Sequence, residues 1–114
     1  MKPLDHERIV QLFAEESARF TAEGFFGADL YEQLANDPIL PENLEPAVCA
    51  AILNVLPSAM AQRRKRGDAP SFLRLAQNSV VYPRHAFCMW LRDRFVERLP
   101  ALANREYTQV PATT

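Results

Sequence analysis

Residues 53–75 read LNVLPSAMAQRRKRGDAPSFLRL, a stretch that contains four consecutive cations, Arg63, Arg64, Lys65 and Arg66. Gly67 follows the run, and an apolar segment comes soon after it. Such a cluster can be a solvated helix end that compensates the helix dipole, a nuclear import signal, or the edge of a surface that binds nucleic acid. Its neighbours in the chain decide between these interpretations.

The composition predicts one compact, mostly helical domain. The 114 residues are 48% hydrophobic, which is enough for a modest core. Three glycines and nine prolines favour helices with abrupt ends over a turn-rich β protein. Cys49 and Cys88 stand far apart in apolar surroundings, so we expect buried thiols in a reducing cytoplasm. A metal site that joins them with His6 and His85 would lack the closely spaced ligand pairs typical of such sites, and no cofactor is expected.

Charge is distributed unevenly along the chain. Residues 1–43 hold three basic and nine acidic side chains, whereas residues 44–114 hold ten basic and five acidic ones. Residues 44–114 are therefore suited to bind a polyanion, which would repel residues 1–43. Uneven surface charge is, however, also common in small proteins. The start, MKPLDHERIV, has charges where a secretory signal needs an apolar run, and no window is apolar enough for a membrane span. We therefore expect a cytoplasmic protein, and a nucleoid-associated one if its polyanion is chromosomal DNA.

Two helices are predicted in the acidic part. Asp5 is a suitable N-cap, apolar residues then recur at helical spacing, and Gly24 is a natural stop, so residues 6–22 should form an amphipathic helix. A shorter helix is expected over residues 28–35, where the sequence NDP ends it. We interpret residues 1–43 as an acidic helical extension that packs on the rest of the chain and supplies a dimer or partner surface.

The start of the basic part predicts two short helices separated by a tight turn. The first covers residues 46–53 and is followed by Asn54, the type of residue besides glycine that best tolerates left-handed backbone. The second covers residues 58–65. This arrangement is typical of a helix-turn-helix. Leu56 stands where a capping side chain is usual, so the second helix lacks a cap unless Ser58 supplies it.

A hairpin and a long helix follow. SFLRL (71–75) and VVY (80–82) are β-favourable and flank the polar tip AQNS, which predicts a β-hairpin. The last helix is expected over residues 83–99, because Pro83 can open it and Pro100 ends it. Residues 100–114 show no periodicity and are interpreted as a flexible tail. The aromatic side chains expected in the core are Phe72, Phe87 and Trp90.

The order helix, turn, helix, hairpin, helix resembles the small winged DNA-binding domain shared by MerR-like regulators and phage-type excisionases. In that family a proline-started helix ends in Leu-Gly-Val, a basic run ends in Gly, and a strand ending in Tyr leads into a helix with Ala-Trp-Leu. The matching positions here are Pro46, Ile52 to Val55, Pro57, Ser58, Arg64 to Gly67, Pro70, Phe72, Leu73, Leu75, Tyr82 to Arg84, Trp90 and Leu91. The resemblance covers residues 44–95. It implies a mainly α fold in which residues 44–99 form a winged helix-turn-helix with a small β-hairpin wing, preceded by the N-terminal helices.

Candidate DNA contacts follow from the chemistry of the second helix and its surroundings. In a helix-turn-helix this helix enters the major groove, where Gln62 can pair with adenine and Arg63 or Arg64 with guanine. The side chains assigned to the groove are Ser58, Gln62 and Arg63. Those assigned mainly to phosphates are Arg64, Lys65, Arg66, Arg74 and Arg84.

The expected function is that of a small DNA-binding protein of a mobile element (phage, plasmid or integrative element), either a transcriptional regulator or an excisionase. Its partners would be double-stranded DNA, a second copy or a cooperative oligomer, and a recombinase. No nucleophile–base pair, Gly-rich phosphate loop or paired-carboxylate motif stands in the sequence, so we do not expect an enzyme. The alternative is a protein-interaction module on the same scaffold that does not bind DNA. The small residues 59–61 and the hairpin tip without a basic residue favour that alternative.

Overall fold

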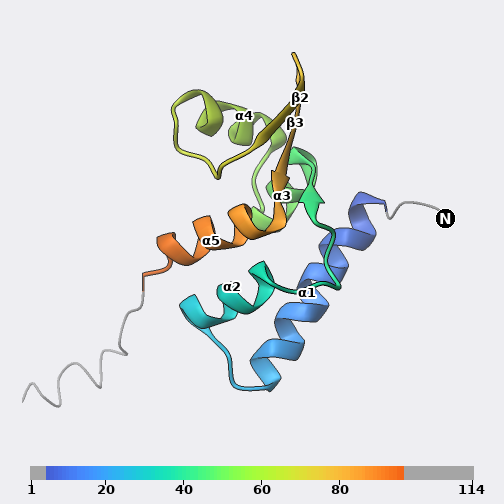
Figure 1. Cartoon of the computed structure of the whole chain (residues 1–114), viewed down its shortest axis with the longest axis vertical. Coiled ribbons are helices and arrows are strands. Elements are labelled where there is room, and N and C mark those ends of the chain that lie inside the picture. The colour runs from blue at the N-terminus through green and yellow to red at the C-terminus, as the bar shows by residue number, and fades with distance from the viewer. Residues whose placement is uncertain (1–4, 97–114) are drawn as a thin grey trace, which may run out of the picture.

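Residues 5–96, the part that the computed structural model describes, form five helices and a small three-stranded antiparallel sheet (Figure 1). The helices are α1 (His6–Ala22), α2 (Gly27–Ala35), α3 (Pro46–Leu53), α4 (Pro57–Lys65) and α5 (Arg84–Arg94). The strands are β1 (Asn43–Leu44), β2 (Leu73–Ala76) and β3 (Ser79–Pro83), in the spatial order β1-β3-β2. The expected mainly helical fold with a β-hairpin is thereby confirmed, while the tail predicted for residues 100–114 lies outside the described residues.

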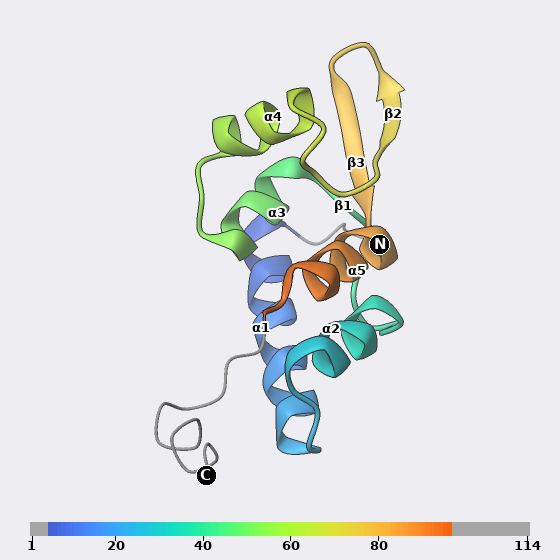
Figure 2. The ribbon, with the colours of Figure 1, turned by 90° about the vertical axis from the view of Figure 1, so that its left-hand side faces the viewer.

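One core joins the acidic and the basic parts of the chain. α2 packs along α5, and α1 packs on α3. Figures 1 and 2 place α4 and the β2–β3 hairpin at one end of the molecule, with α2 and the second half of α1 at the other. The largest fully buried side chains come from both parts: Leu34, Leu44, Val48, Cys49, Met60, Tyr82, Phe87 and Cys88. The N-terminal helices are therefore built into the fold.

The predictions for the first two helices agree with the structure. α1 has the predicted bounds, and its N-cap Asp5 accepts a hydrogen bond at Oδ1 from the backbone N–H of Arg8 over 2.8 Å. This bond satisfies one of the free donors of the first turn. α2 begins at Gly27, one residue before the predicted start.

The last helix is shorter than predicted. α5 ends at Arg94, and Phe95 turns away with extended backbone at φ −72° and ψ 126°. Its ring lies against Tyr31 of α2, with 6.5 Å between the ring centroids. The predicted end at Leu99 is therefore wrong, because Phe95 packs sideways on α2 instead of continuing the helical stripe.

The turn between α3 and α4 has the predicted left-handed residue. Asn54 has φ 60° and ψ 45°, and the N–H of Val55 donates to the carbonyl of Ala50 over 2.9 Å. This 6→1 bond is the usual way to close a helix on a left-handed residue. α4 then begins after Leu56, an exposed residue that gives no side-chain cap, and Ser58 does not supply one.

The sheet holds one strand that the sequence pattern did not predict. β1 is only two residues long and pairs with β3, Leu44 opposite Tyr82. The hairpin register shifts between Arg74 and Ala76, which is a bulge in β2. Phe72 precedes β2 and is 36% exposed, so its expected place in the core is wrong, whereas Phe87 is fully buried.

Both cysteines are buried, as predicted. Cys49 of α3 and Cys88 of α5 are free thiols with no exposed surface. Burial raises the pKa of each thiol to about 12, because an apolar interior disfavours the thiolate. Neither thiol ionises at neutral pH.

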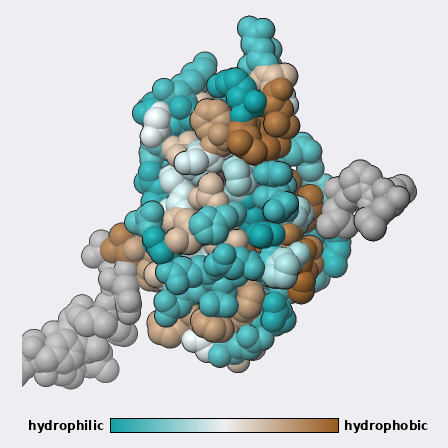
Figure 3. All heavy atoms as spheres, viewed as in Figure 1, coloured by the Kyte–Doolittle hydropathy of each residue, from teal (hydrophilic) through white to brown (hydrophobic). Residues whose placement is uncertain are grey.

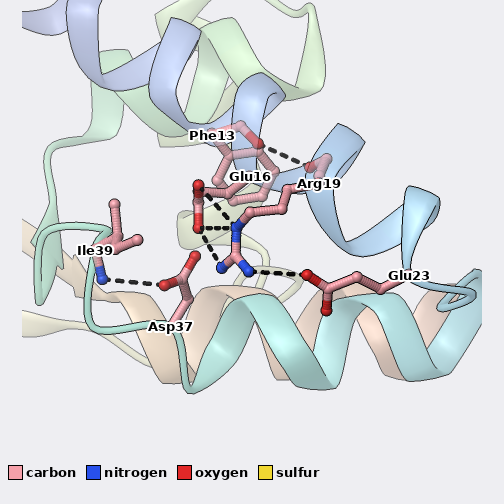
Figure 4. A network of polar contacts seen from close by, with 7 residues as sticks. Phe13, Glu16, Arg19, Glu23, Asp37 and Ile39 are labelled. Carbon is pink, nitrogen blue, oxygen red and sulfur yellow. Dashed lines mark hydrogen bonds and ion pairs between the residues drawn. The ribbon is translucent and has the colours of Figure 1, made fainter.

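Polar side chains of α1 face Asp37 in the loop that follows α2 (Figure 4). Glu16 accepts a hydrogen bond at Oε1 from Nη2 of Arg19 over 2.7 Å, and this bond lowers the pKa of the Glu16 carboxyl. Asp37 is 2% exposed, and its Oδ1 accepts from the N–H of Ile39 over 3.0 Å. Its Oδ2 has no hydrogen-bond donor among the described residues. Burial first, and then the neighbouring Glu16 carboxylate, raise the pKa of Asp37.

Replacement of Asp37 by Asn should stabilise the protein at neutral pH. Protonated Asp37 favours the folded state. This contribution to the free energy of unfolding is fully present below the ordinary pKa of 3.8 and is lost as the pH rises through the raised pKa of the folded state. The contribution of Glu16 to stability has the opposite pH dependence, since its lowered pKa means that this contribution is lost as the pH falls below 4.5. An amide at position 37 carries no charge and, unlike a carboxylate, has N–H groups that can donate to Glu16. We expect Asp37→Asn to raise Tm at about pH 7 by roughly 4 °C and to flatten its pH dependence.

Thermal unfolding at several pH values measures this effect. Glu42→Gln, which neutralises an exposed carboxylate in the loop before β1, is the matched control and should leave Tm nearly unchanged. A lower Tm of Asp37→Asn at neutral pH would contradict the destabilisation ascribed to the buried Asp37 charge.

A side-chain cap at α4 should also stabilise the fold. Leu56 is 72% exposed at the N-cap position, so Leu56→Ser removes little buried surface and adds an acceptor for the first turn of the helix. We expect the free energy of unfolding to rise by about 1 kcal/mol. Urea unfolding measures the stability of this variant. Leu56→Ala is the control, because it also removes the leucine side chain but cannot cap the helix. Equal stability of the two variants would mean that no cap forms.

Candidate nucleic-acid interface

A cationic cleft lies between α4 and the β2–β3 hairpin. It encloses about 330 Å³. Its lining residues are Arg64, Lys65, Phe72, Arg74, Gln77, Asn78 and Val80. Three of the seven are cations and none is acidic, so the cleft is suited to an anion. We call it the α4–hairpin cleft.

Arg64 joins the two walls of this cleft. Its Nη1 donates to the hydroxyl oxygen of Tyr82 over 3.0 Å, and Tyr82 is fully buried in β3. The hydroxyl group of a buried tyrosine needs such a partner, and here a guanidinium from α4 provides it. The bond fixes the guanidinium of Arg64 in the lining of the cleft.

Phe72 holds two cations beside it. The guanidinium carbons of Arg64 and Arg74 lie 5.8 and 5.6 Å from its ring centroid. The ring also meets Tyr82 edge to face, with 6.2 Å between the centroids. Arg74 in addition donates from Nη1 to the carbonyl of Gln77 over 2.9 Å, across the hairpin turn. The half-exposed Phe72 therefore brings a helix cation and a hairpin cation close together.

The other residues predicted on α4 lie on its exposed side or at its end. Ser58, Gln62, Lys65 and Arg66 are exposed. Arg63 is half-buried and pairs through Nη1 with Oδ2 of Asp68 over 3.3 Å. The four consecutive cations therefore differ in role, since Arg63 is bound to a carboxylate and Arg64 to a hydroxyl.

Arg84 lies elsewhere. It is the first residue of α5, and its Nε and Nη1 donate to the carbonyls of Ala35 and Leu40 over 3.1 and 2.7 Å. These bonds hold the end of α2 and the loop after it. The structure does not bring Arg84 to the α4–hairpin cleft, and its assignment to a phosphate remains a prediction without support from its position.

Three residues that shape this region were missed as site residues. Tyr82 and Phe72 position the cations, and Asp68 pairs with Arg63. One signal for Asp68 stands in the sequence, since it is the sole acidic residue between Glu45 and Asp93. Nothing in the periodicity distinguishes Phe72 from a core residue.

Comparisons of the chain with protein-family models, with characterised proteins and with solved structures find no match. Among residues 5–96, no three His, Cys, Asp or Glu side chains are grouped as a metal site would require. None of the helices described is long and apolar enough to cross a membrane. The chemistry of the α4–hairpin cleft is therefore the basis for a functional interpretation.

The bond between Arg64 and Tyr82 can be tested by stability. Tyr82→Phe removes the acceptor and leaves the shape of the ring unchanged, so we expect a loss of about 1 kcal/mol in the free energy of unfolding. Tyr31→Phe removes the same atom from a half-buried ring of α2, away from the cleft, and is the matched control. Urea unfolding measures both variants. Equal losses of stability in the two variants would show that the bond between Arg64 and the Tyr82 hydroxyl does not stabilise the fold.

Proposed function

We propose that the protein binds double-stranded DNA, with α3 and α4 as a helix-turn-helix and the β2–β3 hairpin as a wing. The observation that carries this proposal is the α4–hairpin cleft, in which Arg64, Lys65 and Arg74 meet without an acidic residue. In such a motif the second helix enters the major groove and flanking cations bind the phosphates on each side.

The cleft is suited to one stretch of phosphate backbone. Tyr82 occupies only Nη1 of Arg64, so its other N–H groups are available to a phosphate. Lys65 and Arg66 extend the positive surface along the end of α4, and both are exposed. Because Phe72 and Tyr82 hold Arg64 in advance, less side-chain freedom is lost on binding.

Base recognition would depend on the exposed side of α4. Gln62 can pair with adenine, and Ser58 lies one turn earlier on the helix. Few other polar groups stand between them, because residues 59–61 are Ala, Met and Ala. A single copy would therefore discriminate weakly between sequences. A homodimer or a cooperative oligomer, as in a mobile-element regulator or excisionase, would multiply the contacts.

Binding to DNA should depend steeply on salt. If Arg64, Lys65, Arg66 and Arg74 each neutralise one phosphate, log K should fall with log salt concentration with a slope of about −3.6. This corresponds to a loss of about 150-fold in affinity between about 50 and 200 mM salt. Fluorescence anisotropy of a labelled duplex of mixed sequence measures the slope. A parent chain that does not bind duplex at low salt would overturn the proposal.

Substitution of single cations locates the surface. Lys65→Ala should weaken binding and reduce the slope by about 0.9, because one phosphate contact is lost. Arg8→Ala is the matched control, since Arg8 is an exposed cation of α1 that pairs with Glu15. Equal effects of the two substitutions would show that the DNA does not bind at α4.

The competing function is that of a protein-interaction module on the same scaffold. The hairpin has an apolar surface below a hydrophilic tip (Figure 3). Leu73 and Leu75 of β2 are 49% and 64% exposed there. Retained fold without any salt-sensitive DNA binding would favour this second function.

A further inference from the structure

The chain places one carboxylate at the basic end of α4. Gly67 has φ 77°, and the N–H of Asp68 donates to the carbonyl of Arg63 over 2.8 Å, which closes the helix. This cap fixes the position of Asp68 at the C-terminal end of α4. A negative charge is unfavourable at that end of a helix, so neighbouring cations must stabilise it.

Two arginines from different elements share this carboxylate. Oδ2 of Asp68 pairs with Nη1 of Arg63, and Oδ1 accepts a hydrogen bond from Nη2 of Arg94 in the last turn of α5. The guanidinium of Arg94 also lies over the ring of Trp90, 4.5 Å from its centroid. Arg94 is therefore held in place by its own helix, whereas Arg63 is held by Asp68.

The surroundings of Asp68 contain little other negative charge. Between Glu45 and Asp93 the sequence has seven basic residues and this one acid. Arg63 is half-buried beside the exposed end of α4, and 37% of the Asp68 side chain is exposed. A DNA phosphate that approaches α4 therefore meets a guanidinium whose preferred partner, an oxyanion, is already present.

We infer that Asp68 is an internal competitor of the DNA backbone: in the free protein it occupies Arg63, and a phosphate displaces it on binding. The inference rests on the proposed DNA-binding function and adds a residue that sets its strength. Arg94 makes the exchange possible, because Asp68 keeps one cationic partner after Arg63 has moved to the phosphate. Without Arg94, binding would leave a half-buried carboxylate unpaired.

Removal of the Asp68 charge should tighten the binding of DNA. Asp68→Asn keeps the size of the side chain and the backbone cap but releases Arg63 for the DNA. Arg63 then reaches the phosphate without leaving a carboxylate, so binding should tighten about threefold, the worth of a partly exposed ion pair. The salt slope should stay close to that of the parent, because Arg63 contacts a phosphate in both complexes. Asp93→Asn, which neutralises an exposed acid paired with Arg92, is the matched control and should change neither quantity appreciably.

The experiment compares the full chain with its variants by anisotropy on one labelled duplex over a salt series, with circular dichroism as a check of the fold. Tighter binding by Asp68→Asn, with a salt slope close to that of the parent, supports the inference. If the parent binds DNA while Asp68→Asn binds equally or more weakly, the inference is wrong and the DNA-binding function stands. If the parent does not bind, both are wrong.

A second variant separates competition from a general effect of charge. Arg94→Ala should weaken binding of the parent, because displacement of Asp68 from Arg63 would then leave the carboxylate unpaired. In the Asp68→Asn background the same substitution should have little effect, since no carboxylate remains. An equal loss in both backgrounds would show that Arg94 itself contacts the DNA, and the exchange mechanism would be rejected.

Discussion

The guanidinium of Arg84 connects most of the elements on which the arrangement depends. It donates to the carbonyl of Ala35, one of the last-turn carbonyls that α2 leaves without a partner, and to the carbonyl of Leu40 in the following loop. The backbone N–H of Arg84 donates to the carbonyl of Glu42 over 2.7 Å, next to β1. One residue thus fixes the end of α2, the approach to β1 and the start of α5. The hairpin is attached to this frame through β3, and α4 is attached through α3.

Local signals in the sequence were sufficient for most of the helices. A cap at Asp5 and regular apolar spacing defined α1, and Asn54 defined the turn because few other side chains tolerate its backbone conformation. β1 could not be predicted, since two residues carry no periodicity. The end of α5 depends on a contact between Phe95 and Tyr31, residues far apart in the sequence that only the tertiary structure brings together.

The candidate site was predictable in composition but not in arrangement. The basic run indicated a polyanion, and Arg64 and Lys65 do line a cleft. The sequence could not show that Arg84 would be bound to backbone carbonyls, because an arginine after a strand looks the same whether it faces solvent or a helix end. Nor could it show that neighbouring arginines of one helix would have different partners, since that depends on where Tyr82 and Asp68 are placed by the fold.

The two buried thiols can report local opening of the core. Cys49 lies on α3, which packs on α4 in the turn motif. Cys88 lies on α5, which packs along α2. Only a thiolate reacts readily with alkylating reagents or oxidants, and burial keeps both groups protonated and covered. Each reaction at these sulfurs therefore requires that the core has opened. The rate of thiol modification would measure how often the core opens. A faster rate at Cys49 than at Cys88, or the reverse, would show whether α3 or α5 opens more readily.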